Sequence, residues 1–175
     1  MFDDFTKHRV LQPFFKEPTT KHQLREISRE TEISLPTVRD YVNELAEEDF
    51  LEKVEEGTYP GYKASKSERF KLYKKLEKVR KLHETGLVEE IEKKFHPNSI
   101  VLFGSAANGE DTEESDIDIL IVAGEKEFDT TEYEGAFNRE INLQFMTEDE
   151  LAANTEFANS AANGITLKGF LKVKR

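Results

Sequence analysis

Two aspartates separated by a single residue are the side chains of this sequence best placed to do chemistry. Asp116 and Asp118 lead into an apolar run, IDILIV, whose composition predicts a β-strand. Side chains alternate between the two faces of a strand, so both carboxylates should point the same way, roughly 7 Å apart. Carboxylate oxygens are the ligands that hard divalent cations such as Mg²⁺ or Mn²⁺ prefer. The pair therefore predicts a metal site.

A glycine and a serine end the apolar run that precedes these aspartates. This run begins at Ile100 and predicts a strand that stops at Gly104 and Ser105, where a short helix would begin. The first backbone N–H groups of a helix have no partner within it and can bind an anion. Gly104 lacks the Cβ that would block a phosphate, and Ser105 adds a hydroxyl donor. A phosphate site beside a metal site indicates the chemistry of nucleotide transfer.

The order of these parts is more specific than any one of them. From Gly86 to Gly169 the chain resembles the minimal nucleotidyltransferases of the DNA polymerase beta superfamily, whose motif is a Gly-Ser followed by an Asp-x-Asp. The resemblance implies an α/β domain with a mixed sheet, in which Asp116 and Asp118 bind metal and act in catalysis. The residues that it assigns to the nucleoside triphosphate are Gly104, Ser105, Gly109 and Ser115.

Two positions depart from the pattern of that family. Asn108 stands where members often have an arginine that faces the phosphates. A third metal-binding carboxylate usually lies on a later strand, and the corresponding residue here is Asn142, which is neutral and cannot act as a base. Glu140 lies two residues earlier, on the same face of the expected strand, and has a longer side chain. Either Glu140 acts as the third catalytic carboxylate or the site is impaired.

Composition limits the class of protein. The chain of 175 residues has 35% charged and 37% hydrophobic residues, which suits one or two small domains. It contains no cysteine, which excludes disulfides and thiolate metal sites. No apolar run approaches the length of a membrane span, and no signal-peptide pattern opens the chain. These features predict a cytoplasmic protein that does not bind membranes.

The first third of the chain has a helical pattern of its own. Ser34 can cap a helix that has Pro36 in its first turn. Apolar residues recur in this helix at helical spacing, namely Val38, Val42 and Leu45. Two further helices precede it, and a hairpin that turns at residues 55–57 follows it. Three helices and a two-stranded wing resemble a winged helix-turn-helix, an α+β domain that we expect at residues 1–64.

In a winged helix the third helix enters the major groove of DNA and the wing contacts the backbone. The residues expected to face DNA are Thr37, Arg39, Asn43, Lys53, Tyr59 and Lys63. Of these, Arg39 and Asn43 belong to the types that read base edges. Four acidic residues in and after the same helix oppose phosphate binding: Glu44, Glu47, Glu48 and Asp49. The alternative is a winged helix that serves only dimerisation or contact with a partner protein.

A strongly basic helix is expected to connect the two domains, at residues 65–85. From Lys63 to Lys81 the chain has nine basic and two acidic residues. Apolar residues recur at every third position of this segment and predict a packed stripe of Phe70, Tyr73, Leu76 and Val79. The basic residues are then either a solvated face or a surface that binds nucleic acid or a partner.

Two more elements complete the nucleotidyltransferase domain that we expect at residues 86–175. One helix should run from Thr147 to Ala162, with Thr147 and Glu150 as a capping box. The segment from Gly164 to Gly169 should be a short strand, which resembles the last strand of the same family.

The favoured function is transfer of a nucleoside monophosphate from a nucleoside triphosphate to an unidentified acceptor hydroxyl, with Mg²⁺ or Mn²⁺ as cofactor. A first alternative is a DNA-binding regulator whose transferase domain senses nucleotide without turnover, which Asn108 and Asn142 favour. A second is an antitoxin-like transferase that modifies a partner protein. The sequence leaves open whether the winged helix binds duplex DNA, a partner protein or a second copy of the chain.

Overall fold

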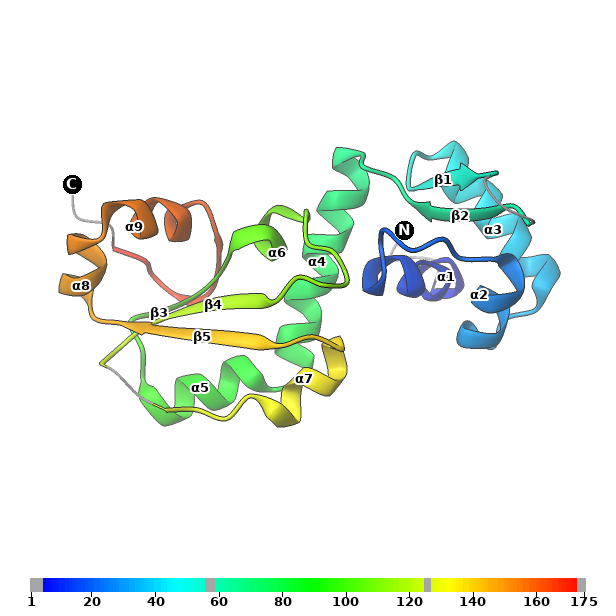
Figure 1. The fold of residues 1–175 in the computed structure, drawn as a ribbon. Coiled ribbons are helices and arrows are strands. Elements are labelled where there is room, and N and C mark those ends of the chain that lie inside the picture. The colour runs from blue at the N-terminus through cyan, green and yellow to red at the C-terminus, as the bar shows by residue number, and fades with distance from the viewer. Residues whose placement is uncertain (1–4, 56–58, 125–126, 173–175) are drawn as a thin grey trace. The chain divides into compact units, whose positions relative to one another are not determined.

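The structure is a computed structural model that describes residues 5–55, 59–124 and 127–172 (Figure 1). The chain divides into two compact units, residues 1–74 and 75–175, and each has an apolar core. The division falls within helix α4 (Glu68–Glu84). The expected domain limits at residues 64 and 85 therefore stay a prediction. None of the described helices is both long and apolar enough to cross a membrane.

Before α4, the described residues of the first unit form three helices followed by a two-stranded antiparallel sheet. Its elements are α1 (Phe5–Lys16), α2 (Leu24–Thr31), α3 (Leu35–Glu47), β1 (Leu51–Val54) and β2 (Gly61–Ala64). The predicted stripe of α3 is fully buried, with Val38, Val42 and Leu45 inside the core. This arrangement confirms the helix-turn-helix region that the sequence predicted. The turn of the expected hairpin lies in part at residues 56–58, outside the described residues.

The cap of α3 differs from the expectation. Pro36 lies in the first turn, as predicted, but the side chain of Ser34 makes no capping hydrogen bond to the helix backbone. Its hydroxyl instead bonds the hydroxyl of Thr37 at 2.7 Å. Ser34 therefore is the N-cap residue, as predicted, but its side chain bonds a second hydroxyl one turn away in place of the helix backbone.

The second unit is an α/β domain built on a four-stranded mixed sheet, which confirms the predicted fold class. The strand order is β5-β4-β3-β6, with β4 and β5 parallel and the other pairs antiparallel. The strands are β3 (Ser99–Phe103), β4 (Ile117–Val122), β5 (Ile141–Met146) and β6 (Ile165–Gly169). The helices are α5 (Leu87–Phe95), α6 (Gly104–Asn108), α7 (Thr131–Phe137), α8 (Glu148–Ala153) and α9 (Thr155–Ala162).

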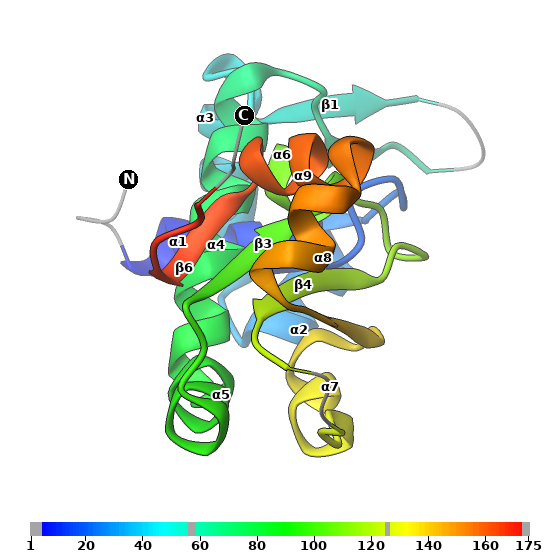
Figure 2. The same ribbon diagram turned by 90° about the vertical axis from the view of Figure 1, so that its left-hand side faces the viewer.

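Helices cover both faces of this sheet (Figures 1 and 2). Ile117 and Ile119 pack with α5 and α7 on one face, while Leu120 packs with α8 and α9 on the other. Side chains alternate along β4, so Asp118 belongs to the face of Leu120. Asp118 therefore lies near the start of β4, on the face of the sheet that α8 and α9 cover.

Two expectations about helices were wrong. The single helix predicted from Thr147 to Ala162 is two helices, because Asn154 ends α8 and its side chain caps α9 by accepting from the N–H of Phe157. The capping box of Thr147 and Glu150 is present. In α4, Leu76 is 44% exposed and does not join a buried stripe, whereas Lys78 is only 8% exposed. A charge partner, described below, keeps Lys78 inside.

Candidate functional site

The Gly-Ser turn and Asp118, the aspartate that lies on β4, meet at one end of the sheet. Phe103, the last residue of β3, pairs with Asp118 on β4. Gly104 follows with a φ of +70°, a conformation that favours glycine. A Cβ at this position would lie 3.0 Å from Oδ2 of Asp118. The missing side chain of Gly104 thus leaves space directly beside this carboxylate.

Asp116 joins the same group from the loop that precedes β4. The strand begins at Ile117, so Asp116 is exposed at its entrance. On β5, Asn142 is the pairing partner of Asp118. The side-chain amide of Asn142 donates a hydrogen bond to Oδ2 of Asp116 at 3.1 Å. Since paired residues of neighbouring strands point to the same face, the side chains of Asp116, Asp118 and Asn142 converge.

The carboxylates of this site suit one divalent cation. Among the described residues, no group of three Asp, Glu, His or Cys side chains is arranged to hold a metal ion. Glu140 is exposed just before β5, and its backbone carbonyl accepts from the N–H of Ile117 at 3.0 Å. Asp116 and Asp118, beside the space at Gly104, offer two negative charges that could balance one Mg²⁺. Oxygen atoms of phosphate and water could then fill the remaining coordination positions of the ion.

The loop that joins the two halves of the site is fastened to itself and to α6. Ser105 lies in the first turn of α6, and its carbonyl accepts from the N–H of Glu110. Gly109 ends this helix with a φ of +73°. The hydroxyl of Ser115 accepts from the N–H of Thr112 at 2.9 Å. Ser115, predicted to bind nucleotide, therefore closes a turn of the loop.

Sequence reasoning missed a buried charge cluster at this loop. Asp111 is 1% exposed, and its Oδ2 accepts from Nζ of Lys78 at 2.9 Å and from the guanidinium of Arg139. Lys78 comes from α4, and Arg139 lies just before β5. Nothing in the sequence distinguishes Asp111 from the other acidic residues of the loop. A single buried acid among solvated ones has no periodic signal.

The residues predicted to face DNA are largely at the surface of the first unit. Arg39 and Asn43 are exposed on α3, and Thr37 is half-buried. The hydroxyl of Tyr62 on β2 donates to Oδ1 of Asn43 at 3.2 Å, so strand and helix are joined there. Lys53 on β1 forms an ion pair with Glu55, and Lys63 on β2 forms one with Glu52. Tyr59, which precedes β2, is 65% exposed.

Comparison with known families gives these two units their identity. Residues 84–162 match the nucleotidyltransferase domain family, and residues 10–55 match the IclR helix-turn-helix domain. Residues 84–162 thus form a nucleotidyltransferase domain, and residues 10–55 form an N-terminal helix-turn-helix domain. No curated protein and no solved structure matches it. Strands β3, β4 and β5, the Gly-Ser turn and both aspartates lie within the matched nucleotidyltransferase segment, whereas β6 follows it.

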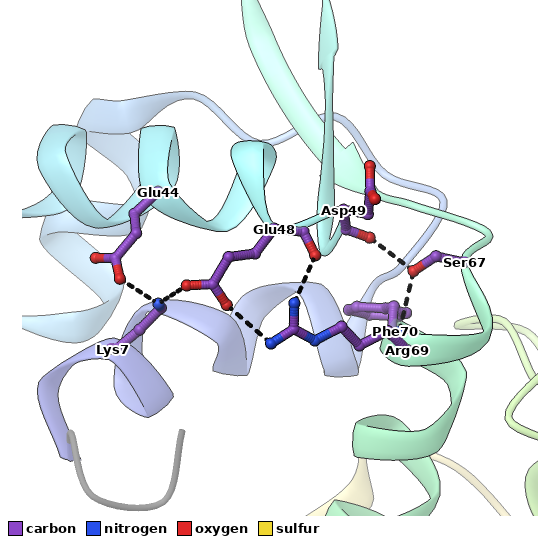
Figure 3. A network of polar contacts seen from close by, with 7 residues as sticks. All are labelled: Lys7, Glu44, Glu48, Asp49, Ser67, Arg69 and Phe70. Carbon is purple, nitrogen blue, oxygen red and sulfur yellow. Dashed lines mark hydrogen bonds and ion pairs between the residues drawn. The ribbon is translucent and has the colours of Figure 1, made fainter.

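Two acidic residues at the end of α3, Glu44 and Glu48, have cationic partners in the first unit (Figure 3). Nζ of Lys7 lies 2.6 Å from a carboxylate oxygen of both Glu44 and Glu48. Arg69 lies 3.3 Å from the carboxylate of Glu48 and donates to its backbone carbonyl. The hydrogen bond from Lys7 lowers the pKa of Glu48. Two of the four acidic side chains expected to oppose DNA are therefore charge-compensated.

Proposed function

We propose that the nucleotidyltransferase domain binds a nucleoside triphosphate with Mg²⁺ and transfers its nucleoside monophosphate to an acceptor hydroxyl, releasing pyrophosphate. The observation that carries this proposal is the closeness of Gly104 to Asp118. A phosphate seated at the Gly-Ser turn would lie beside the carboxylates that hold the cation. Triphosphate chemistry needs this pairing, because positioning and charge stabilisation supply most of the catalysis.

Each residue of the site has a specific task in this proposal. Asp116 and Asp118 would hold the cation, which when bound would stabilise charge on the phosphate oxygens. Gly104 admits the phosphate, and the hydroxyl of Ser105 donates to it. Asn108 brings no positive charge, so backbone N–H groups and the bound cation would have to neutralise the phosphates. Glu140 is the remaining candidate for the base that accepts the proton of the acceptor hydroxyl.

The sheet order suggests where the acceptor approaches. Gly104 follows β3, Asp118 lies on the central β4, and Asn142 lies on the edge strand β5. In an in-line displacement the acceptor attacks opposite the leaving group, so a triphosphate on the β3 side requires an acceptor on the β5 side. An open groove of about 490 Å³ runs along β5, with Asn142, Gln144 and Phe128 among its walls.

Labelled nucleotides test the proposal directly. The full chain is incubated with Mg²⁺ and each of ATP, GTP, CTP and UTP, and pyrophosphate and labelled product are measured. We expect release with at least one nucleotide and its loss in Asp116→Ala. The matched control is Glu90→Ala, since Glu90 is an exposed carboxylate on α5, over the opposite face of the sheet. Release that persists in Asp116→Ala would refute the assignment.

A second candidate function is a DNA-binding regulator that senses nucleotide without turnover. The hydrogen bond between Asn142 and Asp116 favours it, because an amide replaces a third acid at this site. This candidate predicts that nucleotide binds, that no pyrophosphate forms, and that the affinity of the chain for duplex DNA changes when nucleotide is added. Filter binding to a pool of random duplexes, with and without nucleotide and Mg²⁺, measures that change.

A further inference from the structure

Three charges are buried together beside the loop that joins the two halves of the nucleotide site. The side chain of Asp111 has no exposed surface, that of Arg139 is 3% exposed, and that of Lys78 is 9% exposed. The three residues come from different parts of the chain: the loop between α6 and β4, the segment before β5, and α4. The cluster therefore ties together segments that are distant in sequence.

A buried charge cluster is weak evidence for added stability of a fold. Removing charges from water is costly, and replacing a buried ion pair with apolar side chains of similar size is often neutral or stabilising. Hydrogen bonds between charged groups are, however, directional and short. The cluster is thus better suited to fixing the geometry of the loop than to increasing the free energy of unfolding.

The position of Asp111 shows which geometry is fixed. It lies two residues after Gly109, which ends the Gly-Ser helix, and five residues before Asp116. Arg139 lies three residues before Asn142, whose amide bonds Asp116. The contact from Arg139 to Asp111 therefore links the loop to the approach of β5, and both segments lead to the same carboxylate.

We propose that Asp111 is a positioning residue that holds the Gly-Ser half and the aspartate half of the nucleotide site at their working separation. This inference rests on the proposed function, because it assumes that one metal–nucleotide complex engages both halves. A bare cation needs only Asp116 and Asp118. Loss of Asp111 should therefore weaken binding of the metal–nucleotide complex much more than binding of the metal alone.

The test compares two affinities in the full-length chain. Electron paramagnetic resonance measures binding of Mn²⁺ alone and of Mn²⁺ with ATP, GTP, CTP or UTP, in the wild type and in Asp111→Asn. We expect the affinity for the Mn²⁺–nucleotide complex to fall about tenfold or more, because small misplacements of binding groups weaken binding strongly. The affinity for Mn²⁺ alone should fall less than about threefold. Lys7→Met, which removes a comparably buried cation from the helix-turn-helix domain, should change neither affinity.

Each outcome decides a different question. A wild-type chain that binds no nucleotide refutes the proposed function and this inference with it. A wild type that binds nucleotide, with an Asp111→Asn variant that binds equally well or loses both affinities to the same degree, overturns the inference alone. If Asp111→Asn does not fold, Lys78→Met replaces it, since this variant leaves the contact between Arg139 and Asp111 in place. It must lose affinity for the Mn²⁺–nucleotide complex more than for Mn²⁺ alone. Equal losses, or no loss, would also overturn the inference.

Discussion

The side-chain amide of Asn142 donates a hydrogen bond to the carboxylate of Asp116, and the same residue is the strand partner of Asp118. One neutral group therefore contacts or flanks both acids of the site. It satisfies an oxygen of Asp116 without adding negative charge. An acid at this one position would raise the number of negative charges in the proposed cation site from two to three, which makes Asn142 the most informative position to change.

Asn142→Asp should convert the pair of acids into a group of three. Without metal, the added negative charge should lower the free energy of unfolding at neutral pH by about 1 kcal/mol, because like charges then face one another. With Mn²⁺ the affinity should rise about tenfold, since a third carboxylate stabilises the cation. Thermal unfolding with and without Mn²⁺, and Mn²⁺ titration, measure both effects.

Gln144→Glu is the matched control for that substitution. Gln144 lies two residues after Asn142 on the same face of β5, so Gln144→Glu adds the same charge further from Asp116. It should leave Mn²⁺ affinity within about twofold of the wild type, because solvent screens the more distant charge. Equal gains in the two variants would show that general electrostatics, and not the position of Asn142, governs metal binding.

Gly104→Ala should abolish nucleotide binding through its new side chain. Alanine at a φ of +70° is strained by about 1–2 kcal/mol, and its Cβ would lie 3.0 Å from Asp118. Gly86→Ala provides the control, because Gly86 has a φ of +80° with nothing within 4 Å of the added Cβ. Both variants should lose similar stability in urea unfolding, and only Gly104→Ala should lose nucleotide affinity. Nucleotide binding retained in Gly104→Ala would contradict the site.

Lys7→Met should destabilise the helix-turn-helix domain in a pH-dependent way. Lys7 lowers the pKa of Glu48, so their interaction is fully present above the ordinary glutamate pKa and is lost as the pH falls through the lowered value. We expect the variant to lose about 1–2 kcal/mol at pH 7, discounted because both partner carboxylates are partly exposed, and progressively less below about pH 4. Urea unfolding at several pH values measures this.

The exposed ion pair between Lys53 and Glu55 provides the comparison for Lys7. Lys53→Met should leave the unfolding free energy close to that of the wild type at any pH, since water screens the pair. A loss in Lys7→Met that did not diminish at acid pH would mean that the lost packing of the lysine stem, and not its charge, causes the effect.

Arg39→Ala should weaken binding to duplex DNA. Arg39 is exposed on α3, the helix that enters the major groove in related folds, and loss of a base contact there should cost about 1–3 kcal/mol. Lys16→Ala removes the same charge from the end of α1 and should have little effect. Titrations at several salt concentrations measure both. Binding that is insensitive to salt and equal in the two variants would refute the DNA-binding role of this face.

The sequence was most predictive where local pattern decides structure. The Gly-Ser turn, the two strands beside it and the buried stripe of α3 follow from apolar runs and from glycine's conformational freedom. These are properties of neighbouring residues. The Asp-x-Asp pair could likewise be assigned to the entrance of a strand before any tertiary contact was known.

Features that depend on tertiary pairing could not be derived in this way. Asn142 was placed at the position of the third carboxylate only through family likeness, and its bond to Asp116 depends on which strands lie side by side. The burial of Asp111 depends on two cations, from α4 and from the approach to β5. Leu76 was misplaced because a three-residue spacing fits more than one face of a helix.

The parallel pairing of β4 with β5 also determines which changes of length related chains can tolerate. Pairing, and not distance along the chain, decides that an amide lies opposite Asp118. Insertions in the connection before α7 would leave that match intact. A single insertion inside β5 would instead bring Ile141 or Leu143 opposite Asp118 and place an apolar side chain beside this carboxylate. Related chains can therefore tolerate insertions in the connection before α7, whereas β5 can tolerate substitutions but not insertions.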